Sequence, residues 1–451
     1  MEKKSKKNIS IDSILSAFTP ENFLNWIIYS MVIVMPFIIS FSGDRRYVDG
    51  KARFLYLGTV IALIIVILTT KVKLRREHII GLIFLSSIGI ATIFSTSGNV
   101  YWGNIERREG FLMYIVYILL FIFSTNFMKI NTKIIDIFLV SASVMAFYSV
   151  MQMFGIDPIQ VHFFGSVVTT SSSIGTIGNY NFLSTYMILF LMLSVGLFIY
   201  KDDYKYLSFS TLIFFGLLAS RTRGGWLTVG FVTIVLLVYF LVKKKKEYAK
   251  RLGYIFLGFF VALVVLNTTS GNQILERASI SIFSFGASSN QTETKNVQLE
   301  GSFASRANIA RIAFKAFLAK PLIGEGPDSL ADRINSDFNS DLQDHIQRFH
   351  ESIDKAHNEF LEYAACDGIF TIGSYILLLV LIFRGLIKGK KDDESKILMI
   401  VVASYLIQSV FNISVIMVAP IFWILLGYCV QKIYRDIEEK RLSSEDTTIE
   451  A

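Results

Sequence analysis

The chain has 451 residues, of which 53% are hydrophobic and 18% are charged, and its formal net charge is +8. A soluble domain carries about 25% charged residues, so this composition excludes an ordinary soluble protein. The basic residues stand in short clusters between apolar runs, which indicates membrane topology and not a nucleic-acid partner.

Apolar runs that are long enough to cross a bilayer recur along the chain, because a spanning helix needs about 20 residues. The sequence therefore predicts an all-α polytopic membrane protein with about twelve transmembrane helices. No small-residue cleavage site follows the first apolar run, so we expect a retained helix and not a cleaved signal peptide. We expect the helices at 22–42, 53–70, 79–95, 111–128, 134–154, 176–200, 206–220, 226–242, 252–267, 359–387, 397–411 and 420–433.

Every second connection between these runs is rich in Lys and Arg, which predicts that those connections and both termini are cytoplasmic. The basic segments are 3–7, 71–76, Lys129 with Lys133, 201–205, 243–246, 388–391 and Lys432 with Arg435. The predicted organisation is a cytoplasmic N-terminal tail (1–21), helices one to nine (22–267), an extracytoplasmic catalytic loop (268–356), helices ten to twelve (357–433) and a cytoplasmic C-terminal tail (434–451). We expect the polar end of that C-terminal tail to be disordered.

The long loop contains a flexible first part (286–302) and then an amphipathic helix that begins near Ser305 and ends before Pro321. One face of this helix is apolar at helical spacing, so we expect it to lie on the outer membrane surface. That face consists of Ile309, Ile312, Ala313, Ala316 and Phe317. Arg306 stands at the edge of the apolar face, where it must either reach water or hold an anion.

Arginine should be scarce on the outer side of a membrane protein, yet it recurs in the predicted outer connections. These arginines are Arg45, Arg46, Arg53, Arg107, Arg108, Arg221, Arg223 and Arg306. Arg221 and Arg223 lie in SRTRGGW (220–226), whose glycines we expect to let two helices reverse tightly. The pair either contacts lipid phosphates or binds a phosphate or diphosphate, which guanidinium groups hold well.

A second candidate group lies in KAHNEFLEYAACDGIFTIGSY (355–375), where the long loop re-enters the membrane. His357 at this point is either a surface histidine or a base that works near neutral pH. Glu359 and Glu362 follow on the same segment, and Gly368 and Gly373 permit close packing or a break in the next helix.

Other cofactor sites find little support in the sequence. His345 and His350 do not share a helix face and no cysteine accompanies them, so we expect no metal site. The chain contains no P-loop or dinucleotide-binding pattern, so we expect no direct use of ATP and no cofactor. Cys366 and Cys429 stand in apolar surroundings and are expected to be inert packing residues.

Two segments together, SRANIARIAFKAFLAKPLIGEGPDSL and AHNEFLEYAACDGIFTIGSY, resemble the O-antigen ligase and Wzy-type polymerase superfamily. The resemblance rests on an arginine, an amphipathic helix, a Pro-Leu-x-Gly-x-Gly turn and a His-Asn pair that nine residues separate from Gly368. SRTRGGW and GNIERREGFLMYI (103–115) are similar to two further arginine segments of that family.

The resemblance implies a metal-independent, glycosyltransferase-C-like enzyme that moves a glycan from a polyprenyl diphosphate to a saccharide or lipid-linked acceptor. It implies that the reaction takes place on the outer face of the cytoplasmic membrane. Arg221, Arg223 and Arg306 would bind the donor diphosphate, and His357 with Arg306 would be catalytic. Arg108, Asn358 and Glu359 would support them.

Three alternatives stay open. A transporter or flippase of lipid-linked glycans suits the number of helices, although such proteins usually place charged residues near the middle of the membrane. A peptidoglycan-type polymerase would rely on an outer-loop aspartate, for which Asp354 is the nearest candidate. Within the resembled family, polymerase and ligase share these motifs and differ in the acceptor.

Overall fold

A computed structural model describes residues 19–41, 45–164, 172–277 and 297–449, in which every regular element is a helix. Each of the predicted transmembrane segments overlaps one helix. These helices are α2 (Pro20–Ile33), α3 (Asp49–Thr69), α4 (Arg76–Ile93), α5 (Phe111–Phe127), α6 (Thr132–Met153), α8 (Tyr180–Lys201), α9 (Tyr204–Ala219), α10 (Arg223–Val242), α11 (Lys246–Thr269), α16 (Glu359–Lys388), α17 (Asp393–Ser409) and α18 (Ala419–Ile449).

Seven of the described helices, α3, α4, α6, α8, α10, α11 and α16, are long and apolar enough to cross a membrane. The chain is therefore a polytopic membrane protein, while the number of about twelve crossings stays a prediction.

The seven helices differ in how much of their apolar surface is buried inside the protein. The apolar window of α8 is 94% buried, whereas the windows of α3, α10 and α11 are 28% to 33% buried. A helix that is apolar all round belongs in the interior, so α8 forms the centre of the bundle and the other three face lipid.

Two expectations about helix ends were wrong. The first predicted span stops early, because α2 ends at Ile33 and only a short 3-10 turn, η1 (Met35–Phe37), follows. Pro36 in that turn has no N–H to continue the helix. At the other terminus, α18 continues to Ile449 through the polar segment that we expected to be disordered. Ion pairs one helical turn apart, such as Arg441–Glu438 at 2.8 Å, support the helix there.

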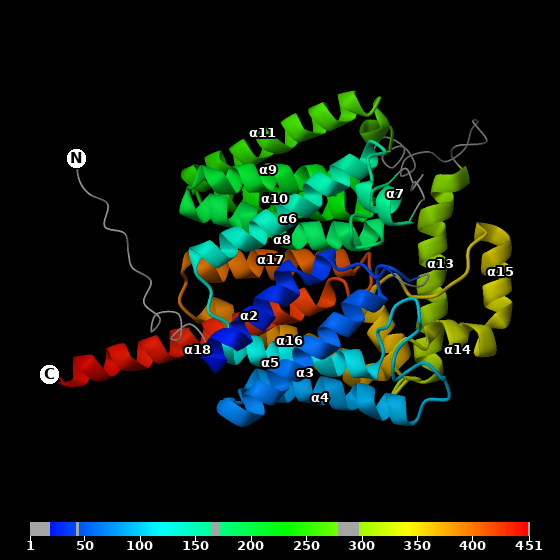
Figure 1. Ribbon diagram of the computed structural model, residues 1–451, viewed down its shortest axis with the longest axis horizontal. Helices are drawn as coiled ribbons and strands as arrows, with labels where there is room; N and C mark the ends of the chain where they lie inside the picture. The colour runs from blue at the N-terminus through cyan, green and yellow to red at the C-terminus, as the bar shows by residue number, and fades with distance from the viewer. Residues whose placement is uncertain (1–18, 42–44, 165–171, 278–296, 450–451) are drawn as a thin grey trace.

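Helices of the long loop cover one end of the bundle (Figure 1). α13 (Val297–Ala319) crosses that end roughly at right angles to the spanning helices, beside α14 (Leu330–Asp337) and α15 (Asn339–Phe349). The apolar face of α13 is buried in one cluster with residues of α14, α15 and α16. The expectation that this face lies on the membrane was therefore wrong, because the protein itself covers it.

The predicted cytoplasmic connections meet at the end opposite α13 (Figure 1). One cavity there is lined by residues from 71–75, 125–129 and 431–442, and another by residues from 128–132, 201–203, 390–394 and 432–439. The structure thus separates the expected inner connections from the long loop, while the direction of the chain in the membrane stays a prediction. The basic segment 3–7 and loop residues 286–296 lie outside the described residues.

Candidate active site

The first arginine pair lies at the turn between α9 and α10. Arg221 makes the reversal with a left-handed backbone, φ +52°, and Arg223 begins α10. Gly224 and Gly225 lie within α10, so their expected role in the turn was wrong. A Cβ atom on Gly225 would stand 2.0 Å from the Ser184 hydroxyl oxygen. The glycines therefore serve the close packing of α10 on α8.

Arg221 is tied to residues that follow α11. Its side chain donates to the Gln273 side chain, and Arg277 Nε donates to the Arg221 carbonyl oxygen at 3.4 Å. Arg221 is 7% exposed, and its Nε is buried without a hydrogen-bond partner. Burial, and after it the charge of Arg277, lowers the pKa of Arg221. The guanidinium still stays protonated near neutral pH, so it presents a buried and incompletely satisfied positive charge.

Arg223 and Arg306 bring further positive charge to the same place. Arg223 lies within electrostatic reach of both Arg277 and Arg306. Its Nε is buried without a partner, and no carboxylate in the described ranges pairs with Arg223 or Arg306. Like charges held together without a counter-charge are unfavourable, particularly where water is partly excluded. The arrangement therefore favours an anionic ligand.

His357 stands next to these arginines. It precedes α16 with φ +52°, and the charge of Arg306 reaches its ring. Burial lowers the pKa of His357, Asp354 opposes this shift and Arg306 adds to it. The net lowering keeps the imidazole neutral near neutral pH, so one ring nitrogen can accept a proton.

Arg107, which sequence reasoning named as an outer arginine but did not assign to the site, also lies within electrostatic reach of His357. Arg107 pairs with Asp354 and also acts on the His357 ring. Burial acts to raise the pKa of Asp354, but the charge and hydrogen bond of Arg107 lower it overall, so Asp354 stays ionised. The sequence marked Arg107 as one of the recurring outer arginines, but the family resemblance suggested its neighbour Arg108 as the supporting residue.

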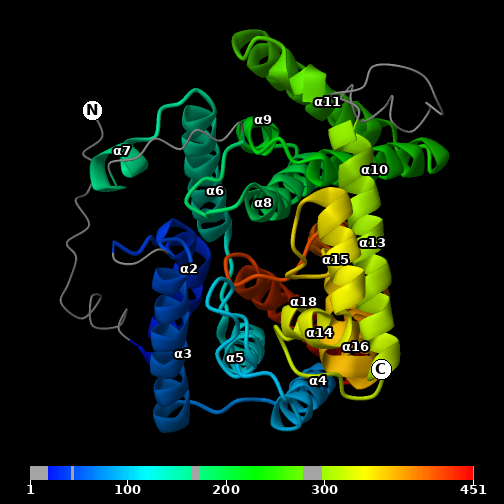
Figure 2. The same ribbon diagram turned by 90° about the vertical axis from the view of Figure 1, so that its right-hand side faces the viewer.

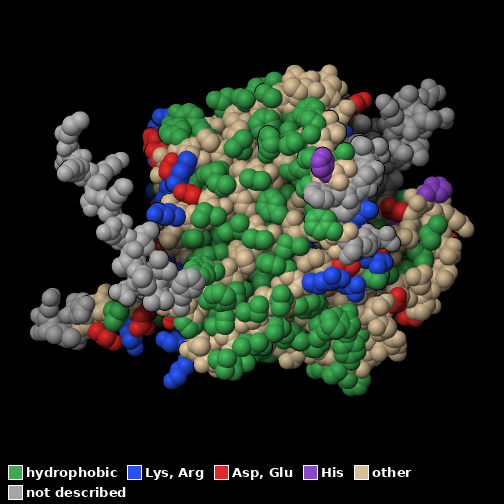
Figure 3. Space-filling model, in the orientation of Figure 1, with side chains coloured by type: hydrophobic (Ala, Val, Ile, Leu, Met, Phe, Trp, Pro, Cys, Tyr) green, Lys and Arg blue, Asp and Glu red, His purple; other side chains and the backbone are tan. Residues whose placement is uncertain are grey.

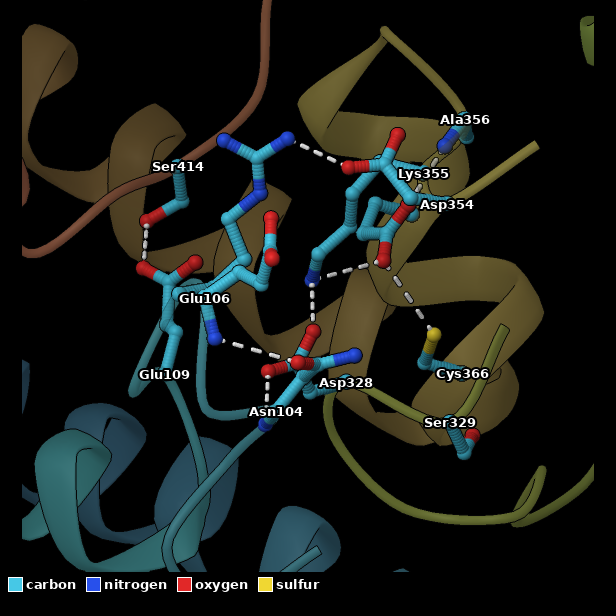
Figure 4. A network of polar contacts seen from close by, with 12 residues as sticks. Asn104, Glu106, Glu109, Asp328, Ser329, Asp354, Lys355, Ala356, Cys366 and Ser414 are labelled. Carbon is cyan, nitrogen blue, oxygen red and sulfur yellow. Dashed lines mark hydrogen bonds and ion pairs between the residues drawn. The ribbon is translucent and has the colours of Figure 1, made fainter. Parts of the chain in front are cut away.

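A buried ionic network lies next to Asp354 and is formed by Lys355 with two carboxylates (Figure 4). Lys355 Nζ lies 2.9 Å from Asp328 Oδ1 and 3.0 Å from Glu362 Oε1, and all three side chains are at most 8% exposed. Burial acts to lower the pKa of Lys355, but the two carboxylates raise it well above its ordinary value. Glu362 Oε2 also accepts from the Ala356 N–H at 2.7 Å. The network thus fixes the residue that precedes His357, and sequence reasoning missed both Lys355 and Asp328.

The glycine-containing turn after α13 is interlocked with a break in α16. Gly368 interrupts α16 with φ +79°, and a Cβ there would stand 2.3 Å from the Leu322 carbonyl oxygen. The N–H groups of Glu325 and Gly326 donate to the Cys366 carbonyl oxygen at 2.7 and 2.9 Å. This contact explains why the turn and Gly368 occur together, since each satisfies backbone groups that the other leaves open. Gly373, in contrast, faces open space.

Comparison with protein families adds to this geometry. Residues 208–376 match the family model described as O-antigen ligase. Residues 208–376 thus form an O-antigen ligase domain. The matched segment contains Arg221, Arg223, Arg306 and His357, and the match supports a membrane protein that transfers glycans. No curated protein matches the chain.

The supporting residues that the family resemblance suggested all have structural partners. Arg108 Nε binds Asp49 Oδ1 at 3.1 Å and so turns toward α3. Asn358 caps α16 by accepting from the Leu361 N–H at 3.0 Å. Glu359 accepts from the hydroxyls of Tyr375 and Tyr405 at 2.7 and 3.0 Å inside the bundle. Arg306 thus lies within electrostatic reach of both Arg223 and His357, whereas the three supporting side chains are held by other partners.

The loop histidines show no shared site. His345 is buried in α15, where its Nδ1 lies 3.0 Å from Asn308 Nδ2, and His350 ends the same helix with a left-handed backbone. Within the described residues, no group of three His, Cys, Asp or Glu side chains is placed to hold a metal ion. Cys366 and Cys429 are buried and form no disulfide bond.

Proposed function

We propose that this protein is a glycosyltransferase that moves a glycan from a polyprenyl diphosphate to an acceptor hydroxyl. The observation that carries the proposal is that Arg306 lies within electrostatic reach of both His357 and Arg223, which shares a turn with Arg221, with no carboxylate paired to Arg223 or Arg306 among the described residues. A diphosphate supplies the missing negative charge, and its oxygens match the paired donors of guanidinium groups.

The arginines would act on the leaving group. As the bond between the anomeric carbon and the diphosphate oxygen breaks, the electron pair stays on the diphosphate and its charge rises. Fixed guanidinium donors stabilise that developing charge more strongly than the ground state, which is the source of catalysis. Arg306 would contact both the diphosphate and the reacting centre, because its charge reaches Arg223 and His357.

His357 would act on the acceptor. A neutral imidazole can accept the proton of the attacking hydroxyl while the oxygen bonds to the anomeric carbon. Burial and Arg306 favour this neutral form, and Asp354 stabilises the imidazolium that results. By analogy with the family, we expect inversion at the anomeric carbon.

The donor's own phosphoester bond would supply the energy, so the proposal requires neither nucleotide nor cofactor, and the arginines would take the place of a metal ion. We place the reaction on the outer face of the cytoplasmic membrane, with both termini in the cytoplasm. The acceptor would be a saccharide or a lipid-linked saccharide, and the process would be the assembly of a cell-surface polysaccharide by polymerisation or ligation.

A direct test uses the purified full-length protein in detergent with a polyprenyl-diphosphate oligosaccharide, EDTA and no nucleotide. We expect release of polyprenyl diphosphate and transfer of the glycan, with a ladder of products from a polymerase and one product from a ligase. Arg306→Ala and His357→Ala should each lose at least about 100-fold in kcat/KM.

Arg311→Ala is a matched control, because Arg311 lies on α13 five residues after Arg306 but pairs with Asp341 at 3.1 Å. Full activity in the His357 and Arg306 variants would contradict the assigned site. If no variant transfers glycan, yet the protein moves the lipid-linked glycan across a liposome membrane, the chain is a flippase instead.

A further inference from the structure

A second group of arginines lies at the beginning of α3 and takes no part in the donor site. Arg45 forms the turn before α3, since its carbonyl oxygen accepts from Val48 and Asp49. Arg53 lies one turn into the helix, and Arg108 reaches α3 through Asp49. We call Arg45, Arg53 and Arg108 the α3 arginine group. Figure 3 shows Lys and Arg side chains gathered on this side of the molecule, in front of the long-loop helices.

The positive charge of the α3 arginine group is not neutralised. Asp49 binds Arg108, but no ion pair joins Arg45 or Arg53 to a carboxylate in the described part of the chain. Arg45 Nε is buried without a hydrogen-bond partner. The hydroxyl of Tyr56, which Arg108 reaches electrostatically, is also buried without one. Unsatisfied donors around a net positive charge indicate a site for an anion.

An apolar path continues from Arg53 along the same face of α3. Leu57, Ile61, Ile64 and Leu68 follow at helical spacing and are 63%, 38%, 50% and 75% exposed. Only 28% of the apolar window of α3 is buried in the protein. A ligand that fits both features has an anionic head at the outer end and a long apolar tail, which is the chemistry of a lipid phosphate.

The α3 arginine group is linked to the reaction centre through the doublet Arg107–Arg108. Arg107, the neighbour of Arg108, pairs with Asp354 and acts on His357. Viewed along the helices, α3 lies on one side of the molecule and α10 and α13 on the other, with α14 and α16 between them (Figure 2). His357, which precedes α16, is within electrostatic reach of Arg306 on α13 and of Arg107, the neighbour of Arg108.

We propose that the α3 arginine group binds the diphosphate of a lipid-linked acceptor, so that the enzyme is a polymerase. This inference rests on the proposed function. The acceptor hydroxyl would attack the anomeric carbon of the donor glycan and give its proton to His357. The donor diphosphate would leave with the bonding electron pair, whereas the acceptor keeps its own diphosphate on the α3 arginine group. A ligase whose acceptor carries no lipid diphosphate would have no use for this second site.

The test is the number of lipid diphosphates that the full-length protein binds. Undecaprenyl diphosphate, labelled in its phosphate groups, is titrated into nanodiscs of neutral phospholipid. We expect two sites per chain in the wild type. Arg53→Ala should weaken one site at least about tenfold, and Arg223→Ala should weaken the other. Arg311→Ala should keep both, and because Arg53 is exposed its removal should leave the fold intact.

The outcomes separate the two proposals. If the wild type binds no lipid diphosphate at an Arg223-dependent site, the proposed function is contradicted. If the wild type has only the Arg223-dependent site, the second site alone is overturned. Nanodiscs that contain phosphatidylglycerol, and a parallel titration with inorganic diphosphate, identify the source of the phosphate. Displacement from the Arg53-dependent site by phosphatidylglycerol at equal concentration would mean ordinary membrane lipid, and would overturn the inference. Equal affinity for inorganic diphosphate would overturn it as well.

Discussion

Three residues at the end of the bundle that α13 covers have unusual backbone conformations. Arg108, Arg221 and His357 have φ values of 55°, 52° and 52°. A non-glycine residue in this region costs about 1 kcal/mol or more, so the surrounding contacts must hold it there. Such strain gathers at functional sites, where the direction of one side chain matters more than local stability. At this scale the surrounding contacts hold Arg108, Arg221 and His357 in place, and the Nε atoms of Arg221 and Arg223 are buried without a hydrogen-bond partner.

The pH dependence of the reaction follows from the surroundings of His357. If the neutral imidazole is the base, kcat/KM should fall as the pH drops through the pKa of His357, which lies below the ordinary value of about 6.5. Asp354 raises that pKa, so Asp354→Asn should move the acid limb to lower pH by about 0.5 to 1 unit. Asp341→Asn, on the outer side of α15, should leave it in place. A shift to higher pH in Asp354→Asn would contradict this assignment of charges.

Charge alone should not replace the donor arginines. Arg223→Lys keeps the positive charge but loses the fork of donors that can bind two diphosphate oxygens at once. We expect kcat/KM to fall by about 100-fold, with Arg311→Lys as the control on an exposed pair. Initial rates at saturating acceptor and varied donor would measure this effect. Equal rates for Arg223→Lys and the wild type would show that the site needs only a point charge.

At the scale of elements, one contact between a turn and a helix break sets the relative position of these residues. The turn that follows α13 fits into the break of α16. Arg306 lies on α13, and His357 directly precedes Asn358, the residue that caps α16. The two catalytic candidates come from segments that are joined at Gly368, so their spacing depends on this contact. The apolar face of α13, packed on α14, α15 and α16, fixes the rotation of Arg306 about the helix axis.

Gly368→Ala tests this contact directly. The new Cβ would stand 2.3 Å from the Leu322 carbonyl oxygen, at a backbone φ of +79° that alanine disfavours. We expect a loss of about 3 kcal/mol of stability and a fall in activity, because the turn and the helix must separate. Gly373→Ala, in the same helix and facing open space, should be neutral or slightly stabilising. Thermal unfolding of both variants in detergent decides the point, and equal melting temperatures would contradict it.

The whole molecule places its chemistry at one end of a helical bundle. α8 forms a buried centre, lipid-facing helices surround it, and α13 to α15 cover the end where the arginines and His357 meet. The connections rich in Lys and Arg lie at the other end. This polarity suits an enzyme whose donor has its diphosphate at one membrane surface and its hydrocarbon tail between the helices and lipid.

The orientation can be tested on cells with a membrane-impermeant maleimide. Cys366 and Cys429 are at most 1% exposed, so the wild type should label little. A cysteine that replaces Ser340 on the exposed side of α15 should label from outside. One that replaces Glu247, at the exposed beginning of α11, should label only after permeabilisation. The reverse pattern would place the arginines on the cytoplasmic side and contradict the proposed direction of the chain.

The sequence by itself determined the membrane class and the approximate position of each long helix, and it supplied the residues that we propose for the donor site. These features depend on local signals: apolar length, basic connections, and an arginine or histidine beside a recognisable turn. Only the tertiary structure decided which arginines meet. Arg107 and Arg108 are adjacent in sequence, yet one turns to Asp354 and the other to Asp49. The buried network of Lys355 with Asp328 and Glu362 joins segments that no local pattern pairs. Such partners depend on long-range packing, because the charge of a side chain is written in the sequence but its nearest counter-charge is not.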